Sequence, residues 1–211
     1  DVNSDGRRDV IVGGRYGGSV LLGDGTGRFA RTDFGWPSSG YSAGVGAGDL
    51  NGDGRADLVF GFWMGASGVT VAFGNGDGTF NAATNYWLGR RPSDVAICDV
   101  NVDGNVDLII ALGERRYNWC VLTNRGKGVF GVPVYYPDGE MTSRALAVGD
   151  VNGDGRSDVV VLRDYGVIQV WLNDGRGTFG LRGTYALQFT ASSIAGADFN
   201  LDGAYDVIVR G

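Results

Sequence analysis

A nine-residue pattern of acidic and amide side chains occurs five times in this chain. Each copy reads D-x-N-x-D-G-x-x-D and is followed at once by an apolar run, as in DVNGDGRSDVVVL from Asp150 to Leu162. A repeat of about 20–50 residues is typical of solenoids, propellers and other arrays, so the period restricts the possible folds more than any other feature. The copies are about 50 residues apart and begin at Asp1, Asp49, Asp99, Asp150 and Asp198.

The fourth copy shows why the pattern predicts a calcium loop. Asp150, Asn152, Asp154 and Asp158 place oxygen atoms at positions 1, 3, 5 and 9, and Ca²⁺ takes about six to eight such hard donors. The carbonyl at position 7 adds another, and Gly at position 6 allows a turn with positive φ. Position 12 is apolar in every copy, which excludes an EF-hand loop with its Glu. Five intact copies favour a structural Ca²⁺ in each over metal-free Asp/Asn/Gly turns.

Four short strands are expected in each period. Val- and Ile-rich runs such as DLIIAL and DVVVL follow the loops and are apolar on both faces, so their sheets should be buried on both sides. Two further strands are expected around a Gly-rich turn such as NDGRGTF, and a last strand leads to the next loop. Four-stranded antiparallel sheets that cover one another describe an all-β fold, the β-propeller. A phenylalanine that follows the Gly-rich turn is expected in the core: Phe29, Phe80, Phe130 and Phe179.

The ends of the repeat pattern are uneven. The first unit lacks the strand before its loop, and the last stops after its second strand. We therefore expect residues 1–211 to form a single β-propeller domain or fragment, an incomplete ring or arc that exposes strand edges. Cys98 and Cys120 fall on the first and third strands of one expected sheet, too far apart for a disulfide, and are predicted to be free thiols.

The repeats resemble the FG-GAP/VCBS family of calcium-binding propeller blades, found in integrin α-subunit heads, fungal propeller lectins and many secreted bacterial proteins. Phe34-Gly35 and Phe73-Gly74 are weak echoes of the Phe-Gly element, and no Gly-Ala-Pro occurs, which favours the broader secreted family. The resemblance implies up to five structural Ca²⁺ ions, each held by positions 1, 3, 5 and 9 and the carbonyl of position 7. These residues are Asp1, Asn3, Asp5, Arg7, Asp9, Asp49, Asn51, Asp53, Arg55, Asp57, Asp99, Asn101, Asp103, Asn105, Asp107, Asp150, Asn152, Asp154, Arg156, Asp158, Asp198, Asn200, Asp202, Ala204 and Asp206.

The rim opposite the aspartate loops carries arginine beside aromatic rings. It holds the connections from second to third strands and from each fourth strand to the next blade. Arginine pairs with carboxylates and aromatic rings stack on sugars, so these connections are predicted to bind a ligand. An alternative for Trp36, Trp87 and Tyr136 is that they only close each blade. The predicted ligand residues are Arg15, Tyr16, Trp63, Arg115, Arg116, Tyr117, Trp119, Arg163 and Tyr165, and the connections between blades add Tyr41, Arg90 and Arg91.

Composition argues against several classes of function. The chain has no histidine, which excludes His-based catalytic triads and His metal sites. Its arginines are scattered, without a nucleic-acid-binding motif, and no apolar run is long enough to cross a membrane as a helix.

We therefore expect a secreted or cell-surface propeller that is not an enzyme, is stabilised by calcium, and recognises carbohydrate or extracellular protein, as in adhesion. Neither nucleic acid binding nor membrane insertion is expected. One alternative is a structural repeat unit of an extracellular fibre, with a homo-oligomer or filament completing the open ring. A further alternative is an accessory domain of a secreted polysaccharide-active enzyme.

Overall fold

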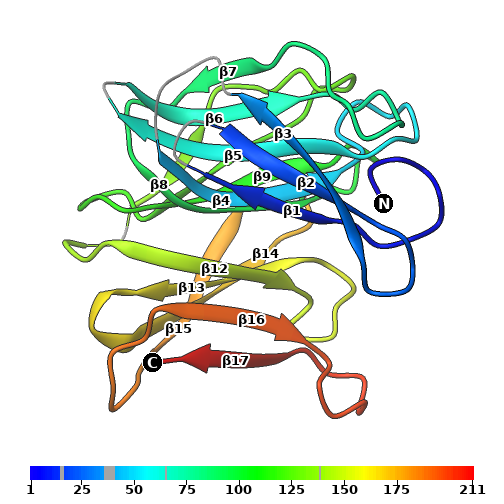
Figure 1. The fold of residues 1–211 in the computed structure, drawn as a ribbon. Coiled ribbons are helices and arrows are strands. Elements are labelled where there is room, and N and C mark those ends of the chain that lie inside the picture. The colour runs from blue at the N-terminus through cyan, green and yellow to red at the C-terminus, as the bar shows by residue number, and fades with distance from the viewer. Residues whose placement is uncertain (15–16, 36–40, 65, 138) are drawn as a thin grey trace.

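The protein is built from antiparallel β-sheets arranged as propeller blades (Figure 1). The computed structural model describes residues 1–14, 17–35, 41–64, 66–137 and 139–211. Three sheets have four strands in chain order, as the sequence predicts. They consist of β4 (Tyr41–Gly48), β5 (Asp57–Met64), β6 (Ala66–Ala72) and β7 (Thr84–Trp87); β8 (Pro92–Cys98), β9 (Asp107–Leu112), β10 (Trp119–Leu122) and β11 (Val134–Tyr136); and β12 (Ser143–Gly149), β13 (Asp158–Arg163), β14 (Val167–Asn173) and β15 (Phe179–Ala186).

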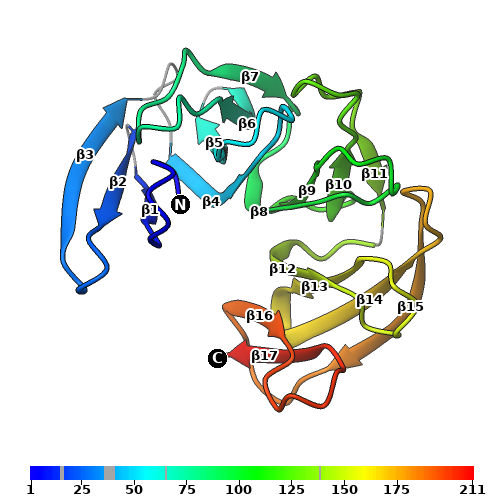
Figure 2. The ribbon, with the colours of Figure 1, turned by 90° about the vertical axis from the view of Figure 1, so that its right-hand side faces the viewer.

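The two end sheets are smaller, and the blades do not close into a ring. One end sheet has three strands, β1 (Val10–Gly13), β2 (Gly17–Gly23) and β3 (Phe29–Gly35), and the other has two, β16 (Ser193–Ala197) and β17 (Asp206–Arg210). Figure 2 shows the five sheets side by side along an open arc, with these two at its ends. The expectation of an incomplete propeller is confirmed. In the part of the chain that the structure describes, no helix has the length and apolarity to cross a membrane.

The second strands of the central blades are buried on both faces. Every residue of β9 and of β13 is buried, as their unbroken apolar runs predict, because a neighbouring blade covers each face. The prediction is wrong at the ends of the arc. β1 and β17 have the same Val/Ile sequence, DVIV, but alternate between exposed and half-buried positions, because a blade lies against only one face of each.

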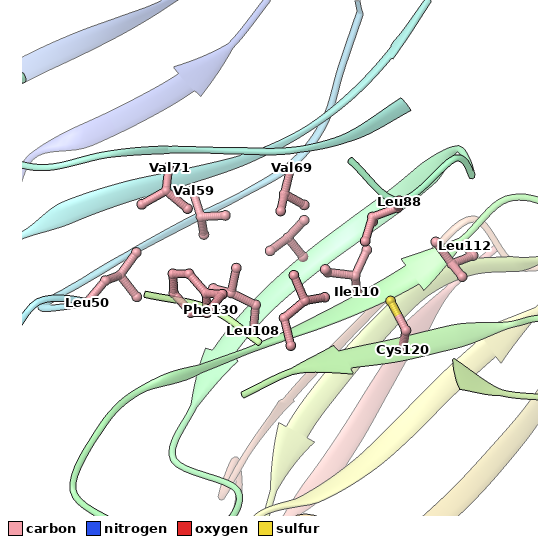
Figure 3. Close-up of a cluster of buried hydrophobic side chains, with 12 residues drawn as sticks. Leu50, Val59, Val69, Val71, Leu88, Leu108, Ile110, Leu112, Cys120 and Phe130 are labelled. Carbon is pink, nitrogen blue, oxygen red and sulfur yellow. The ribbon is translucent and has the colours of Figure 1, made fainter. Parts of the chain in front are cut away.

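The recurring phenylalanine packs each blade against the preceding one. Phe130 is buried among Leu50, Val59 and Ile110, between the second and third blades (Figure 3). Phe179 is buried in the next interface and Phe80 is half-buried in the preceding one. Phe29 is 49% exposed, so the prediction of a core role is wrong for this residue, because no other sheet of the described residues packs over it.

The first strands β4, β8, β12 and β16 lie next to one another on the inner side of the arc. A β-bulge interrupts three of them, at Gly44, Ser93 and Arg144. Glycine is required at the first because its φ is +70° and an added Cβ would lie 2.5 Å from the amide nitrogen of Val95. The bulges re-aim side chains at the inner edge of each blade.

Both cysteines are free, as predicted. Cys98 ends β8 and Cys120 lies in β10, and β9 pairs between these two strands. Burial raises the pKa of the Cys98 thiol to about 12, which disfavours the reactive thiolate at neutral pH.

Candidate metal loops and recognition rim

The five aspartate loops share one hydrogen-bond pattern. In the first loop, both carboxylate oxygens of Asp1 accept backbone amides, from Asp5 at 3.1 Å and Gly6 at 2.7 Å. The Asn3 side chain donates to Asp5 at 3.0 Å, and Asp5 accepts the amide of Arg7 at 2.8 Å. The other four loops repeat these bonds. The sequence pattern therefore codes for one folded loop, repeated five times.

Two positions in each loop have a left-handed backbone. Gly at position 6 has φ between 81° and 87°, as its presence in all five copies predicts. Position 4 is also left-handed, which the sequence did not reveal because its residue varies. Gly52 and Gly153 occupy it in two loops without strain, whereas Val102 has φ of 59° and Leu201 has φ of 62°. A β-branched residue in this region is unusual, so the side-chain hydrogen bonds must hold the loop of Val102 in place.

The aspartate at position 9 ties its loop to the following strands. In the third blade, the Asp107 side chain accepts the amides of Val100 at 2.9 Å and of Asn124 at 2.7 Å. Asp107, like its equivalents Asp57 and Asp158, is fully buried. Burial raises the pKa of all three carboxyls, the amide hydrogen bonds oppose this, and the aspartates at positions 5 and 1 raise it further.

The first two acidic positions have the opposite electrostatic setting. The backbone amide of Arg7 donates a hydrogen bond that lowers the pKa of Asp5. The backbone amide of Gly155 lowers the pKa of Asp150 in the same way. These carboxylates therefore stay charged at the exposed surface of the loops. Asp5 and Asp150 therefore keep the charge that attracts a cation, whereas Asp57, Asp107 and Asp158 at position 9 are fully buried.

The donor chemistry of the loops fits Ca²⁺. Each holds three carboxylates and one amide oxygen within nine residues, and a carboxylate oxygen that accepts one amide still has a free lone pair. In the structure, the side chains of each loop accept hydrogen bonds from the loop's own backbone amides. Among the described residues, no three acidic side chains are close enough together to coordinate one metal ion. Calcium binding at the 25 residues named above stays a prediction.

On the opposite rim, two consecutive arginines stack on aromatic rings of two different blades. The Arg91 guanidinium lies 3.7 Å from the centre of the Trp63 ring, and Tyr41 stacks on the same ring at 4.9 Å between centroids. Arg90 lies 4.0 Å above Tyr117. Cation–π contacts of this kind rigidify the arginines, so this group, which we call the arginine ladder, spans the boundary between the second and third blades.

Glu114 fixes the arginine ladder from the third blade. Its carboxylate lies 3.7 Å from Arg90 and accepts the backbone amide of Arg91 at 3.0 Å. Sequence reasoning named Arg90 and Arg91 but not Glu114, since a single acidic residue after a strand carries no distinctive signal. The ladder therefore combines residues of the strands β4 and β5 with residues of two connections, β7–β8 and β9–β10.

The structure separates the predicted ligand residues into exposed and buried groups. Arg115, Arg116 and Tyr165 are exposed on the rim, and Trp63 and Tyr117 are half-buried within the arginine ladder. Tyr165 is 74% exposed. Arg15 and Tyr16, together with Trp36, lie outside the described residues.

The prediction of a ligand-binding role is wrong for two residues, because they lie in the core. Trp119 is fully buried at the start of β10 and stacks on Tyr136 at 4.1 Å between ring centroids. Arg163 ends β13, is 4% exposed, and donates to the carbonyl of Met141. Tyr136 is buried, which confirms its alternative role in closing the blade. Trp87 is 57% exposed, so burial does not support this alternative role for Trp87.

Solved structures with the same arrangement of blades have little sequence in common with this chain. A crystal structure of BBS1N in complex with ARL6DN aligns with a TM-score of 0.66 and 14% identity. The BP39L lectin from Burkholderia pseudomallei aligns with a TM-score of 0.65 and 17% identity. These alignments cover 95% and 94% of this chain but only 58% of each of those chains. A Tc holotoxin pore from Photorhabdus luminescens aligns with a TM-score of 0.51 and 18% identity, over 99% of this chain and 11% of that one.

The fold and the repeated loops define an open β-propeller built from sequence repeats. The family model described as "FG-GAP-like repeat" matches residues 1–60, 99–161 and 150–209. The chain therefore belongs to the FG-GAP-like repeat family, and the resemblance seen in the sequence is confirmed. Comparison with curated proteins gives no significant match.

Proposed function

We propose that this chain is a calcium-stabilised, non-enzymatic propeller module that recognises carbohydrate through the rim opposite the aspartate loops. The observation that carries the proposal is the arginine ladder, in which Arg90 and Arg91 stack on Tyr117 and Trp63. Rigid aromatic and arginine side chains on a fixed scaffold are typical of recognition surfaces. The shared fold with a lectin is consistent with this function.

An extracellular location follows from the proposed calcium loops. Extracellular modules hold Ca²⁺ with a Kd of about 10⁻⁴–10⁻³ M, and nine-residue loops without the bidentate Glu of an EF-hand suit this weak range. A non-enzymatic role is supported by the use of the remaining acidic residues. Asp24, Asp77 and Asp174 accept amides of their own hairpin turns, so these carboxylates are structural.

A glycan array tests the proposal. Binding of saccharides is expected at millimolar Ca²⁺ and is expected to be lost in EGTA, because the loops that hold the blades would loosen. Arg90→Gln should weaken binding at least tenfold by removing the charge between two blades. Arg176→Gln is the matched control, since Arg176 is exposed on a hairpin turn of the aspartate rim. Equal binding by both variants, or no saccharide bound at all, would contradict the proposal.

Assembly through the ends of the arc is a second candidate function, favoured by exposed apolar side chains. Val10, Val12 and Phe29 are 41%, 47% and 49% exposed at one end, and Ile208 is 53% exposed at the other. An apolar cavity of about 470 Å³ also opens between β14 and β17. Sedimentation velocity over a range of concentrations is expected to show association that Phe29→Asp prevents, and a monomer at every concentration would exclude this candidate.

A further inference from the structure

A polar cavity of about 340 Å³ lies at the inner end of the recognition rim, between the third and fourth blades. It is bordered by the beginnings of β8 and β12, by the residues just before β8, β12 and β16, and by the turns that follow β9 and β13. Its lining consists of arginine, serine, threonine, aspartate and one glycine, without an apolar side chain. The cavities of 640 and 470 Å³ have mainly apolar linings, and one of 540 Å³ is lined by the aspartate loops of the fourth and fifth blades together with Val151 and Tyr205. The cavity of 340 Å³ differs from all three because no apolar side chain lines it.

Two arginines from neighbouring blades give the cavity a positive charge. Arg91 borders it from the third blade, held by its contact with Trp63. It forms no ion pair with any residue that the structure describes. Arg144 borders it from the fourth blade and uses its Nε atom to pair with Asp164 at 2.7 Å. The guanidinium of Arg144 has further N–H groups to donate, and the lining as a whole holds two arginines and one carboxylate.

Hydroxyl groups complete the lining. Ser143 is 1% exposed, and its hydroxyl oxygen has no hydrogen-bond partner within the described residues. The Ser93 hydroxyl donates to the carbonyl of Ser143 at 2.8 Å across the boundary between the blades. Ser192 contributes a third hydroxyl from the segment before β16. A buried hydroxyl without a partner is costly, and a bound polar ligand would provide that partner.

The size and polarity of the cavity match one acidic monosaccharide. A volume of about 340 Å³ is at the lower end of the range for small-molecule sites. Arg91 and Arg144 can pair with a carboxylate, which arginine binds through two parallel N–H donors. Asp164 and the serine hydroxyls can exchange hydrogen bonds with the hydroxyls of the sugar. A protein partner would instead need a broad surface of the order of 1,000 Å² around its carboxylate.

We propose that this cavity binds the carboxylate and neighbouring hydroxyls of an acidic sugar of the uronic acid class. The proposal rests on the proposed carbohydrate recognition and names its ligand class and its position. Arg91 belongs both to the cavity and to the arginine ladder, so the ladder orients one of the two arginines that bind the carboxylate. Sugar residues on either side of the acidic one would extend over the exposed rim.

Titration of the full chain with D-glucuronate, followed by NMR or calorimetry at millimolar Ca²⁺, tests the proposal. D-Glucose is the neutral control, and a glutamate-rich peptide represents a protein ligand. Arg91→Gln and Arg144→Gln should each weaken glucuronate binding about tenfold or more, because each removes charged hydrogen bonds. Ser143→Ala should weaken it about two- to tenfold without lowering the melting temperature, because the hydroxyl oxygen has no partner to lose among the described residues. Arg176→Gln, exposed on the opposite aspartate rim, should bind as the wild type does.

The outcomes separate this proposal from the broader one. Glucuronate binding that is equal in the wild type, R91Q and R144Q would overturn the site but leave carbohydrate recognition by the rim intact. Failure of glucuronate to bind, together with neutral glycans that bind on the array, would overturn the ligand class alone. An array without any bound saccharide would overturn both. Binding of the glutamate-rich peptide in place of glucuronate would assign the cavity to a protein ligand.

Discussion

The middle of the arc and its two ends have nearly the same sequence repeat but different surroundings. Phe130 and Phe29 occupy equivalent positions after a Gly-rich turn, yet Phe130 is 7% exposed and Phe29 is 49% exposed. β9 is fully buried, whereas β1 alternates between exposed and half-buried residues. The difference teaches that the apolar pattern of one repeat specifies an interface with the next repeat, and burial follows only where that neighbour is present.

The aspartate loops show the same contrast. Asp107 in the middle is fully buried and accepts two amides. Asp206 at the end is half-buried and accepts the amide of Phe199 at 3.1 Å. The loops themselves have the same internal hydrogen bonds throughout. Asp9, at the other end, accepts two amides, from Val2 at 2.9 Å and Gly23 at 2.8 Å. Local loop structure is therefore independent of position, whereas the second amide needs a third strand, which the sheet of β16 and β17 lacks.

Removal of calcium should have the largest effect on stability, and the sheets at the two ends of the arc should unfold before those in the middle. At a tenfold excess over Kd, each site adds about 1.4 kcal/mol and five sites add about 7 kcal/mol. EGTA is therefore expected to lower the melting temperature by roughly 15 °C or more. Hydrogen exchange should show earlier loss of protection in β1 and β17 than in β9. An unchanged melting temperature in EGTA would refute the calcium assignment.

Truncation of the equivalent phenylalanines compares the two regions directly. Phe130→Ala should lower the free energy of unfolding by about 3–5 kcal/mol, since it opens a cavity in a packed interface. Phe29→Ala should lower it by less than about 1 kcal/mol, because most of that ring is already in contact with water. Urea unfolding of both variants at the same Ca²⁺ concentration is the measurement. Similar losses would show that the end blade is covered in solution.

Substitution of the aspartate at position 9 compares its contribution to stability in the middle of the arc and at its end. Asp107→Ala leaves two buried amides without an acceptor and should cost about 2–4 kcal/mol. Asp206→Ala releases one amide near solvent and should cost about 1 kcal/mol or less. Thermal unfolding in EGTA measures these costs without a contribution from the metal. Equal costs in EGTA would mean that the amide hydrogen bonds do not set the difference.

The smallest effect concerns Asp94, which joins the third and fourth blades. It accepts the amides of Leu146 at 3.1 Å and of Val95 at 2.9 Å, and burial nevertheless raises its pKa. A raised pKa in the folded state means that the wild type loses stability relative to Asp94→Asn as pH rises from 3.5 through that pKa. Unfolding of the two proteins between pH 3.5 and pH 7 should show this trend. A constant difference between them would contradict it.

The repeated elements could be predicted because they depend on local chemistry. The D-x-N-x-D-G-x-x-D pattern predicted five turns with Gly at positive φ, and the structure has all five. Four-stranded blades, their order and the free cysteines also followed from spacing and apolar runs. The left-handed residue at position 4 was missed because residues such as Val102 and Leu201 rarely adopt a positive φ.

The recognition rim was predicted less well because exposure there depends on contacts between blades. Trp63 lies near the end of the second strand β5 and Trp119 begins the third strand β10. Only Trp119 is enclosed by aromatic rings from its own and the next blade. Arg144 and Asp164 were missed although they form a close ion pair, since they are 20 residues apart and meet only across the first and second strands. No local pattern distinguishes these cases.

The sequence by itself determined the repeat, the aspartate loops, the strands and the uneven ends, because hydrogen bonds within a loop and apolar periodicity within a strand need only nearby residues. Tertiary structure alone decided which phenylalanine is buried, which tryptophan is on the surface, and where Arg91, Ser143 and Arg144 form one cavity. The physical reason is that burial and polar convergence depend on the blade that packs alongside, about 50 residues away in the chain.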